Sequence, residues 1–186
     1  MRTVALFHSV YGLRPAVVEA AGLLRAAGHA VVTPDLYDGP VARTIEEGFA
    51  LSEHIGWATI MRRARKAIVR LPADTVLAGL SMGAGVAGEL LAERPGSAGL
   101  LLLHGTGGDP ATVPPGLPVQ LHVGDADDMF PPAQVAAWRS TMTAAGIEVH
   151  TYPAAGHFFT DPDVPDYNRA AAHLTWQRSL EFLDRL

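Results

Sequence analysis

The feature that most constrains the fold is a regular alternation of short apolar runs with longer segments of helical periodicity. Six apolar runs have the length of strands: residues 3–7, 30–33, 75–80, 98–104, 118–123 and 148–152. Helical patterns follow in four of the five gaps and at the end of the chain: residues 15–27, 45–71, 82–92, 131–145 and 168–186. The remaining gap, residues 105–116, is rich in Gly and Pro and is expected to be a loop.

Strands that are apolar on both faces and separated by helices are typical of a parallel sheet covered on both sides. We therefore expect a single α/β domain over residues 1–186, with about six parallel strands and helices on both faces. No insertion long enough for a cap domain is visible, so we expect an open site. Ligands of such sheets bind beyond the carboxyl ends of the strands, which directs attention to the residues that follow each strand.

The composition excludes several classes of function. The net charge of −5 and the single short basic stretch at residues 62–66 argue against nucleic-acid binding. The absence of cysteine excludes disulfides, thiolate metal sites and a cysteine nucleophile. The first ten residues are too briefly apolar for an export signal, and no run is long enough to span a membrane. We therefore expect a cytoplasmic protein with neither membrane nor nucleic-acid partners.

Residues 76–88, VLAGLSMGAGVAG, contain two overlapping motifs with opposed meanings. Gly83, Gly85 and Gly88 spell the G-x-G-x-x-G fingerprint of dinucleotide sites, but Ser81 and Met82 separate these glycines from the strand. The same stretch spells G-x-S-x-G, in which a sharp strand-to-helix turn exposes a nucleophilic serine. We favour the second interpretation, with Ser81 as nucleophile and the Met82 backbone N–H placed to stabilise an oxyanion.

A serine nucleophile needs a base and an acid that orients the base, and in this architecture both follow the serine along the chain. Three acids, Asp125, Asp127 and Asp128, follow the fifth strand, and among them we favour Asp127. His157 follows the sixth strand and is the expected base. The predicted catalytic residues are therefore Ser81, Asp127 and His157.

Other side chains at this edge of the sheet are candidates for a substrate pocket or a metal site. We expect Tyr11, His104, Phe130 and Phe158 to be possible walls of an acyl pocket, although each could equally be ordinary packing. His104 could be mistaken for a metal ligand together with His8 and His122, but no short ligand spacing links them. We therefore expect no metal site and no cofactor.

The chain resembles the dienelactone hydrolase family of the α/β-hydrolase fold along nearly its whole length. The likeness rests on six segments: FHSVYGLRP, TPDLYDG, GLSMGAG, HVGDADDMFPP, PAAGHFF and YNRAAAHLTWQRSLEFL. The family's G-x-x-D-x-x-hydrophobic-P pattern runs here from Gly124 to Pro131 and selects Asp127. The resemblance further implies that the backbone N–H groups of Val10 and Met82 form the oxyanion hole, and that the sheet is a trimmed version of the fold.

Two departures from the family pattern bear on the substrate. Members that open dienelactones have a cysteine where this chain has Ser81 and a glutamate where it has Ser9. They also hold the substrate carboxylate with an arginine shortly after the histidine, where this chain reads FFTDPD and would repel a carboxylate. The residues therefore favour a small or medium neutral ester or lactone, cleaved by a serine hydrolase through an acyl-enzyme.

Two alternatives remain open at the level of the sequence. The same triad could transfer the acyl group to an acceptor other than water, or the fold could serve as a non-catalytic binding protein. The complete set of three residues argues against the second alternative. The oligomeric state does not follow from the sequence.

Overall fold

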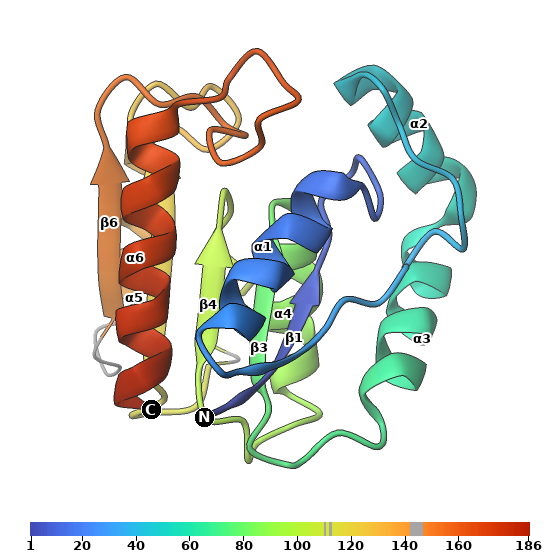
Figure 1. The fold of residues 1–186 in the computed structure, drawn as a ribbon, viewed down its shortest axis with the longest axis vertical. Coiled ribbons are helices and arrows are strands. Elements are labelled where there is room, and N and C mark those ends of the chain that lie inside the picture. Colours follow the sequence, from blue (N-terminus) through green and yellow to red (C-terminus); the bar gives the residue numbers. More distant parts are fainter. Residues whose placement is uncertain (110, 112, 142–146) are drawn as a thin grey trace.

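A computed structural model describes residues 1–109, 111, 113–141 and 147–186 and shows a six-stranded parallel sheet between helices (Figure 1). The strands are β1 (Thr3–Phe7), β2 (Ala30–Val32), β3 (Val76–Leu80), β4 (Leu100–Leu103), β5 (Val119–Gly124) and β6 (Ile147–Tyr152). The helices are α1 (Pro15–Ala26), α2 (Ile45–Ile55), α3 (Trp57–Ile68), α4 (Met82–Leu91), α5 (Pro132–Thr141) and α6 (Arg169–Arg185). The predicted α/β architecture is confirmed; residues 142–145 of the expected helix 131–145 lie outside the described residues.

The strand order β2-β1-β3-β4-β5-β6 reverses the direction of the chain between β1 and β3. Right-handed crossovers then place α1 on one face and the helices from α2 to α5 on the other. The side-chain packing agrees, because α1 and α6 share one buried cluster with the sheet while α3, α4 and α5 share another. A crevice is expected where the strand order reverses, so the loops after β1 and β3 lie at the favoured position for a ligand.

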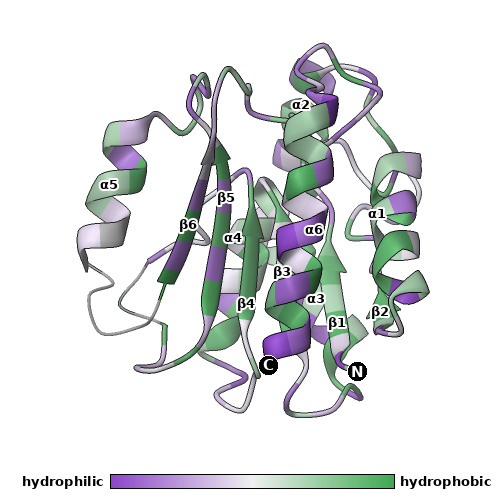
Figure 2. Cartoon of the chain, turned by 60° about the vertical axis from the view of Figure 1, so that its left-hand side comes forward, coloured by the Kyte–Doolittle hydropathy of each residue, from purple (hydrophilic) through white to green (hydrophobic). Residues whose placement is uncertain are grey.

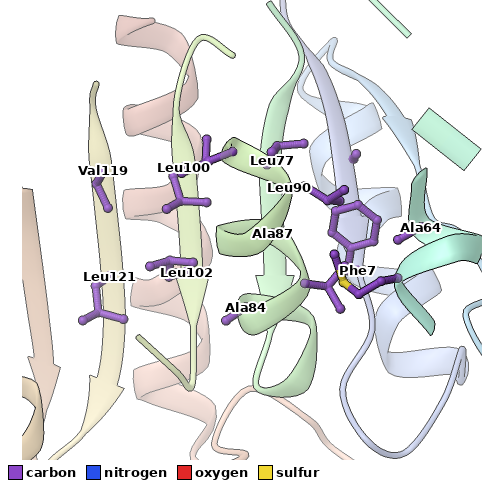
Figure 3. Packing of buried hydrophobic residues seen from close by; sticks show 14 of the residues in the cluster. Phe7, Ala64, Leu77, Ala84, Ala87, Leu90, Leu100, Leu102, Val119 and Leu121 are labelled. Carbon is purple, nitrogen blue, oxygen red and sulfur yellow. The ribbon is translucent and has the colours of Figure 1, made fainter. Parts of the chain in front are cut away.

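The central strands are apolar on both faces because helices cover both faces. Leu100 and Leu102 of β4 face α4, as Figure 3 shows, while Leu101 and Leu103 pack toward α1 and α6. The strands β5 and β6 carry more polar residues than β3 and β4 (Figure 2). Among them, the buried His122 bonds Tyr152 Oη at 2.7 Å and Gln120 Oε1 at 2.8 Å.

The helical pattern expected over residues 45–71 is two helices rather than one. Gly56 ends α2 and begins α3 with φ +78°, a left-handed conformation that interrupts the helical hydrogen bonds. The turn re-aims the chain, so that α2 rises above the carboxyl end of the sheet while α3 packs beside α4 (Figure 1). As a result, the first residues of α3 lie near the loop after β3.

The glycines of the dinucleotide-like motif serve close packing rather than phosphate binding. All three lie within α4, which begins at Met82. A methyl group on Gly83 would overlap the carbonyl oxygen of Phe7, and one on Gly88 would overlap that of Gly107. The absence of side chains at these positions therefore lets α4 pack directly on the end of β1 and on the loop after β4.

This packing predicts opposite effects of alanine at two helical glycines. Gly88→Ala should lower the free energy of unfolding by about 1–3 kcal/mol, because its methyl group overlaps backbone that cannot move freely. Gly22→Ala, at an exposed position of α1 with open space around it, should raise it by about 0.5–1 kcal/mol. Urea unfolding of the two variants measures both values, and equal effects would contradict the packing role of Gly88.

Candidate active site

Ser81 lies on a sharp turn between β3 and α4. Its backbone has φ +54° and ψ −109°, a conformation that costs a non-glycine residue about 1–3 kcal/mol. The Ser81 N–H donates to the carbonyl of Leu103 at 2.8 Å, which fixes the turn to β4. A side chain on Gly79 would overlap the backbone of Gly83, so the tight reversal requires glycine there. The predicted strand–turn–helix context of the G-x-S-x-G motif is therefore present.

Ser81, His157 and Asp127 form one chain of hydrogen bonds across three loops. Ser81 Oγ lies 2.8 Å from His157 Nε2, and His157 Nδ1 lies 2.7 Å from Asp127 Oδ2. The imidazole of His157 is stacked on Phe130, with ring centres 5.7 Å apart, and meets Phe158 edge-on at 4.4 Å. These two rings hold the imidazole in the plane that both hydrogen bonds require.

The environment of Asp127 fixes the tautomer of His157. Burial raises the pKa of Asp127, but the hydrogen bond and charge of His157 and the N–H groups of Phe130 and Met129 outweigh it, leaving the pKa below its usual value. Asp127 is therefore an ionised acceptor, with its Oδ1 receiving the Met129 and Phe130 N–H groups at 2.8 and 2.9 Å. An ionised carboxylate only accepts, so Nδ1 of His157 carries the proton and Nε2 is free to accept the serine proton.

The other two acids of the GDADD segment have different surroundings. Asp125 Oδ1 accepts the N–H of Ala154 at 2.7 Å, which joins the loops after β5 and β6. Asp128 is exposed to solvent. Of the three acids considered from the sequence, the structure places Asp127 against His157.

The two expected oxyanion donors flank Ser81 in space. Val10 follows β1 and Met82 follows the serine, and both residues line the same cavity as Ser81. Within the described part of the chain, neither backbone N–H donates a hydrogen bond to another protein group. His8 fixes the loop after β1 to the segment after β2. Its Nδ1 lies 2.7 Å from the Ser9 carbonyl, and its Nε2 accepts the Leu36 N–H at 3.0 Å.

A buried ion pair ties the loop after β1 to the loop that carries His157. Arg14 Nη2 lies 2.9 Å from Asp161 Oδ1, and both side chains are largely shielded from solvent. The Arg14 guanidinium also covers the ring of Tyr11 at 4.4 Å, and Tyr11 in turn meets Phe158 edge-on at 5.0 Å. Arg14 and Asp161 are 147 residues apart in the sequence, so this pair holds two distant segments against each other beside the imidazole.

A cavity of about 320 Å³ opens beside Ser81, on the face of the sheet covered by α2 to α5. Its apolar walls are Val10, Phe49, Trp57, Met82, Met129 and Phe130. Its polar side chains are Ser52, Ser81 and Thr106, and glycines complete the lining. Phe130 was an expected pocket wall, whereas Phe49, Trp57 and Met129 were not. These three are large apolar residues that are exposed in the fold, and nothing in their sequence pattern distinguishes them.

Three residues expected as possible pocket walls do not line this cavity. Tyr11 and Phe158 are buried together in a cluster between the loops after β1 and β6. His104 is buried with Nε2 2.7 Å from Thr160 Oγ1, and it lines a separate cavity of about 20 Å³ toward α1 and α6. The left-handed backbone of His104, with φ +62°, turns its side chain away from the larger cavity. Phe158 also lines this smaller cavity, so a role of these three residues in an acyl pocket stays a prediction.

The described residues contain no group of three or more His, Asp or Glu side chains arranged to hold a metal ion. Over the same ranges, none of the helices is both long enough and apolar enough to cross a membrane.

The comparison with known families decides the affiliation. The model of the dienelactone hydrolase family matches residues 1–186. The chain belongs to the dienelactone hydrolase family. This membership confirms the resemblance found in the six sequence segments and supports a hydrolytic function. Among curated proteins, none matches the sequence.

Solved structures place this dienelactone hydrolase family member in the α/β-hydrolase fold. A dienelactone hydrolase-like promiscuous phosphotriesterase from metagenomic libraries is 20% identical with a TM-score of 0.77, over 100% of this chain and 87% of that one. The dienelactone hydrolase of Anabaena variabilis is 20% identical with a TM-score of 0.70, over 100% and 86%. A protein of Xanthomonas campestris, described as belonging to the α/β hydrolase superfamily, is 22% identical with a TM-score of 0.67 and full coverage of both chains.

The ion pair between Arg14 and Asp161 predicts a large stability effect. Arg14→Met keeps most of the aliphatic volume but leaves the shielded Asp161 carboxylate without its cation. We therefore expect the free energy of unfolding to fall by about 3 kcal/mol. The control is Arg185→Met, which breaks the exposed pair of Arg185 and Glu148 at 2.6 Å and should cost less than about 1 kcal/mol. Equal losses in urea unfolding would show that the buried pair has no special role.

Burial of histidines predicts that the protein loses stability in mild acid. Burial lowers the pKa of His104 and His122 well below the usual value of 6.5, and that of His8 to a lesser degree. Below pH 6.5 the unfolded chain binds protons that these buried rings do not, so stability falls with decreasing pH. We expect a loss of at least about 1 kcal/mol between pH 7.5 and pH 5.5 in urea unfolding.

Proposed function

We propose that this family member is a serine hydrolase that cleaves a small or medium neutral ester or lactone through an acyl-enzyme on Ser81. The observation that carries the proposal is the continuous pair of hydrogen bonds from Ser81 through His157 to Asp127. A serine that merely began a helix would have no need of a buried, oriented imidazole and carboxylate. The arrangement matches the roles of nucleophile, base and orienting acid.

In the first half of the reaction, Ser81 attacks the carbonyl carbon of the substrate. His157 Nε2 takes the hydroxyl proton as Ser81 Oγ forms the new C–O bond, and the negative charge of Asp127 stabilises the resulting imidazolium. The carbonyl oxygen becomes an oxyanion and accepts hydrogen bonds from the Val10 and Met82 N–H groups. When the intermediate collapses, the bond to the alcohol oxygen breaks and His157 Nε2 returns the proton to that oxygen.

In the second half, water replaces the departed alcohol beside His157. The imidazole takes a proton from the water, whose oxygen bonds to the acyl carbon and regenerates the oxyanion. Collapse of this intermediate breaks the bond to Ser81 Oγ, which recovers its proton from His157 Nε2. The products are a carboxylic acid and an alcohol, and the enzyme returns to its starting state.

The charges near the site favour a neutral substrate. Arg14 lies beside the loop that carries His157, but its guanidinium is already paired with Asp161. Among the described residues that line the cavity beside Ser81, none carries a charge. A free carboxylate on the substrate would therefore be desolvated without a partner, at a cost of several kcal/mol.

Both covalent labelling and turnover should require the hydroxyl of Ser81. The wild-type protein should react with a fluorophosphonate probe and hydrolyse p-nitrophenyl acetate, and Ser81→Ala should lose labelling and at least about 10³-fold of the rate. Ser140→Ala, at an exposed serine on α5, is the matched control and should behave as wild type.

Three results would overturn the proposal. Failure of the wild type to label would indicate a non-catalytic protein. Unchanged turnover in Ser81→Ala would place the chemistry elsewhere. Labelling with turnover only after addition of an alcohol or amine would indicate acyl transfer rather than hydrolysis.

A further inference from the structure

The cavity beside Ser81 lies on one side of the chain of hydrogen bonds that joins Ser81, His157 and Asp127. Val10, Ser81 and Met82 line it, whereas His157 does not. The leaving alcohol must receive its proton from His157 Nε2, so the alcohol departs on the side of the imidazole. The acyl group remains bonded to Ser81 with its oxygen toward the Val10 and Met82 N–H groups, and thus extends into the cavity.

We infer that this cavity is the acyl-binding subsite, that it takes an uncharged hydrophobic acyl group, and that Trp57 sets the length of that group. The inference rests on the proposed serine hydrolase function and adds the class of substrate. Among the walls, Met82 directly follows the nucleophile and Phe130 stacks on the imidazole of His157. Trp57 instead lies over α4 at Gly85, four residues after Ser81. Burial of apolar carbon atoms against such walls stabilises binding by about 0.8 kcal/mol for each methylene group.

Trp57 reaches the cavity because of the turn between α2 and α3. It is the first residue of α3, directly after the left-handed Gly56. Its indole lies over α4 at Gly85, where an added methyl group would stand 3.5 Å from Trp57 Cη2. Gly85 thus provides space under the ring, and any larger residue there would press into the same part of the cavity.

A hydrogen bond fixes the orientation of the indole. Trp57 Nε1–H donates to Glu89 Oε2 at 2.8 Å, one turn along α4 from Gly85. The second oxygen of Glu89 lies 3.4 Å from Arg65 Nη2, and Arg65 is itself held by Glu93 at 2.7 Å. Trp57 is 42% exposed, so packing alone does not hold its ring. Glu89 is therefore a positioning residue that keeps the apolar face of Trp57 toward the cavity.

The experiment compares acyl chains of different length and charge on the complete protein. The substrates are p-nitrophenyl esters from acetate to dodecanoate, together with the mono-p-nitrophenyl ester of succinic acid as the charged acyl group. We expect the wild type to prefer an uncharged chain of intermediate length and to disfavour the succinate by at least about tenfold in kcat/KM relative to butyrate.

Two substitutions should move the preference in opposite directions. Trp57→Ala enlarges the cavity and should raise the kcat/KM ratio of dodecanoate to acetate by at least about tenfold. Gly85→Ala adds a methyl group in the same part of the cavity and should lower that ratio. Val69→Ala, at an exposed apolar residue that ends α3, is the control and should leave the ratio unchanged.

A pair of variants at position 89 tests the positioning role separately. Glu89→Gln retains an oxygen that can accept the indole N–H and should keep the wild-type length profile. Glu89→Leu removes the acceptor, and the freed indole should broaden the profile toward longer chains. A purely structural role of Glu89 would change the melting temperature without changing the length profile.

The failure of this inference is distinguishable from the failure of the proposed function. If the wild type labels with fluorophosphonate but Trp57→Ala and Gly85→Ala leave the length profile unchanged, the acyl group binds elsewhere. The same holds if the succinate ester is the better substrate. If the wild type does not label at all, the serine hydrolase itself is refuted. Thermal melting of each variant shows that a changed profile does not come from unfolding.

Discussion

The left-handed backbone of Ser81 is the constraint on which the rest of the site depends. It lifts the hydroxyl above the edge of the sheet and starts α4 at Met82, whose N–H has no acceptor among the described residues. The strain of this conformation persists because the surrounding packing leaves no alternative: Gly79 and Gly83 lie in contact, and α4 is buried along most of its length. Gly83 therefore belongs to both motifs: it is part of the nucleotide-like fingerprint, and together with Gly79 it makes the turn at Ser81 sterically possible.

The sheet brings Ser81, His157 and Asp127 together, and contacts between loops hold them in place. Parallel strands bring the carboxyl ends of β1, β3, β5 and β6 to one edge of the sheet, so the four loops that follow them lie along the same edge. Local bonds then fix each loop relative to the next. Asp125 joins the loops after β5 and β6, and the pair of Arg14 and Asp161 joins the loop after β1 to the histidine loop. Fold stability and catalytic geometry therefore share the same interactions.

The sequence was sufficient for the architecture and for the chain of hydrogen bonds, because both follow from patterns along the backbone. The alternation of apolar runs with helical segments predicted the sheet, and the position of Ser81, Asp127 and His157 after the carboxyl ends of three strands predicted their proximity. The substrate cavity was not predictable in the same way. The break at Gly56 depends on a positive φ that an isolated glycine in a helical pattern does not reveal. Without that break, Trp57 and Phe49 cannot be placed at the site. The positive φ of the buried His104, +62°, is likewise not visible in the sequence.

The separation of Trp57 from the reacting groups has an evolutionary consequence. Ser81, Asp127 and His157 follow the ends of strands, whereas the wall formed by Trp57 is a half-exposed side chain at the start of a helix. Substitutions at that wall alter which molecules fit without disturbing how a bond is broken. A lineage carrying this arrangement can acquire new substrates by single mutations while its reactive core is inherited intact.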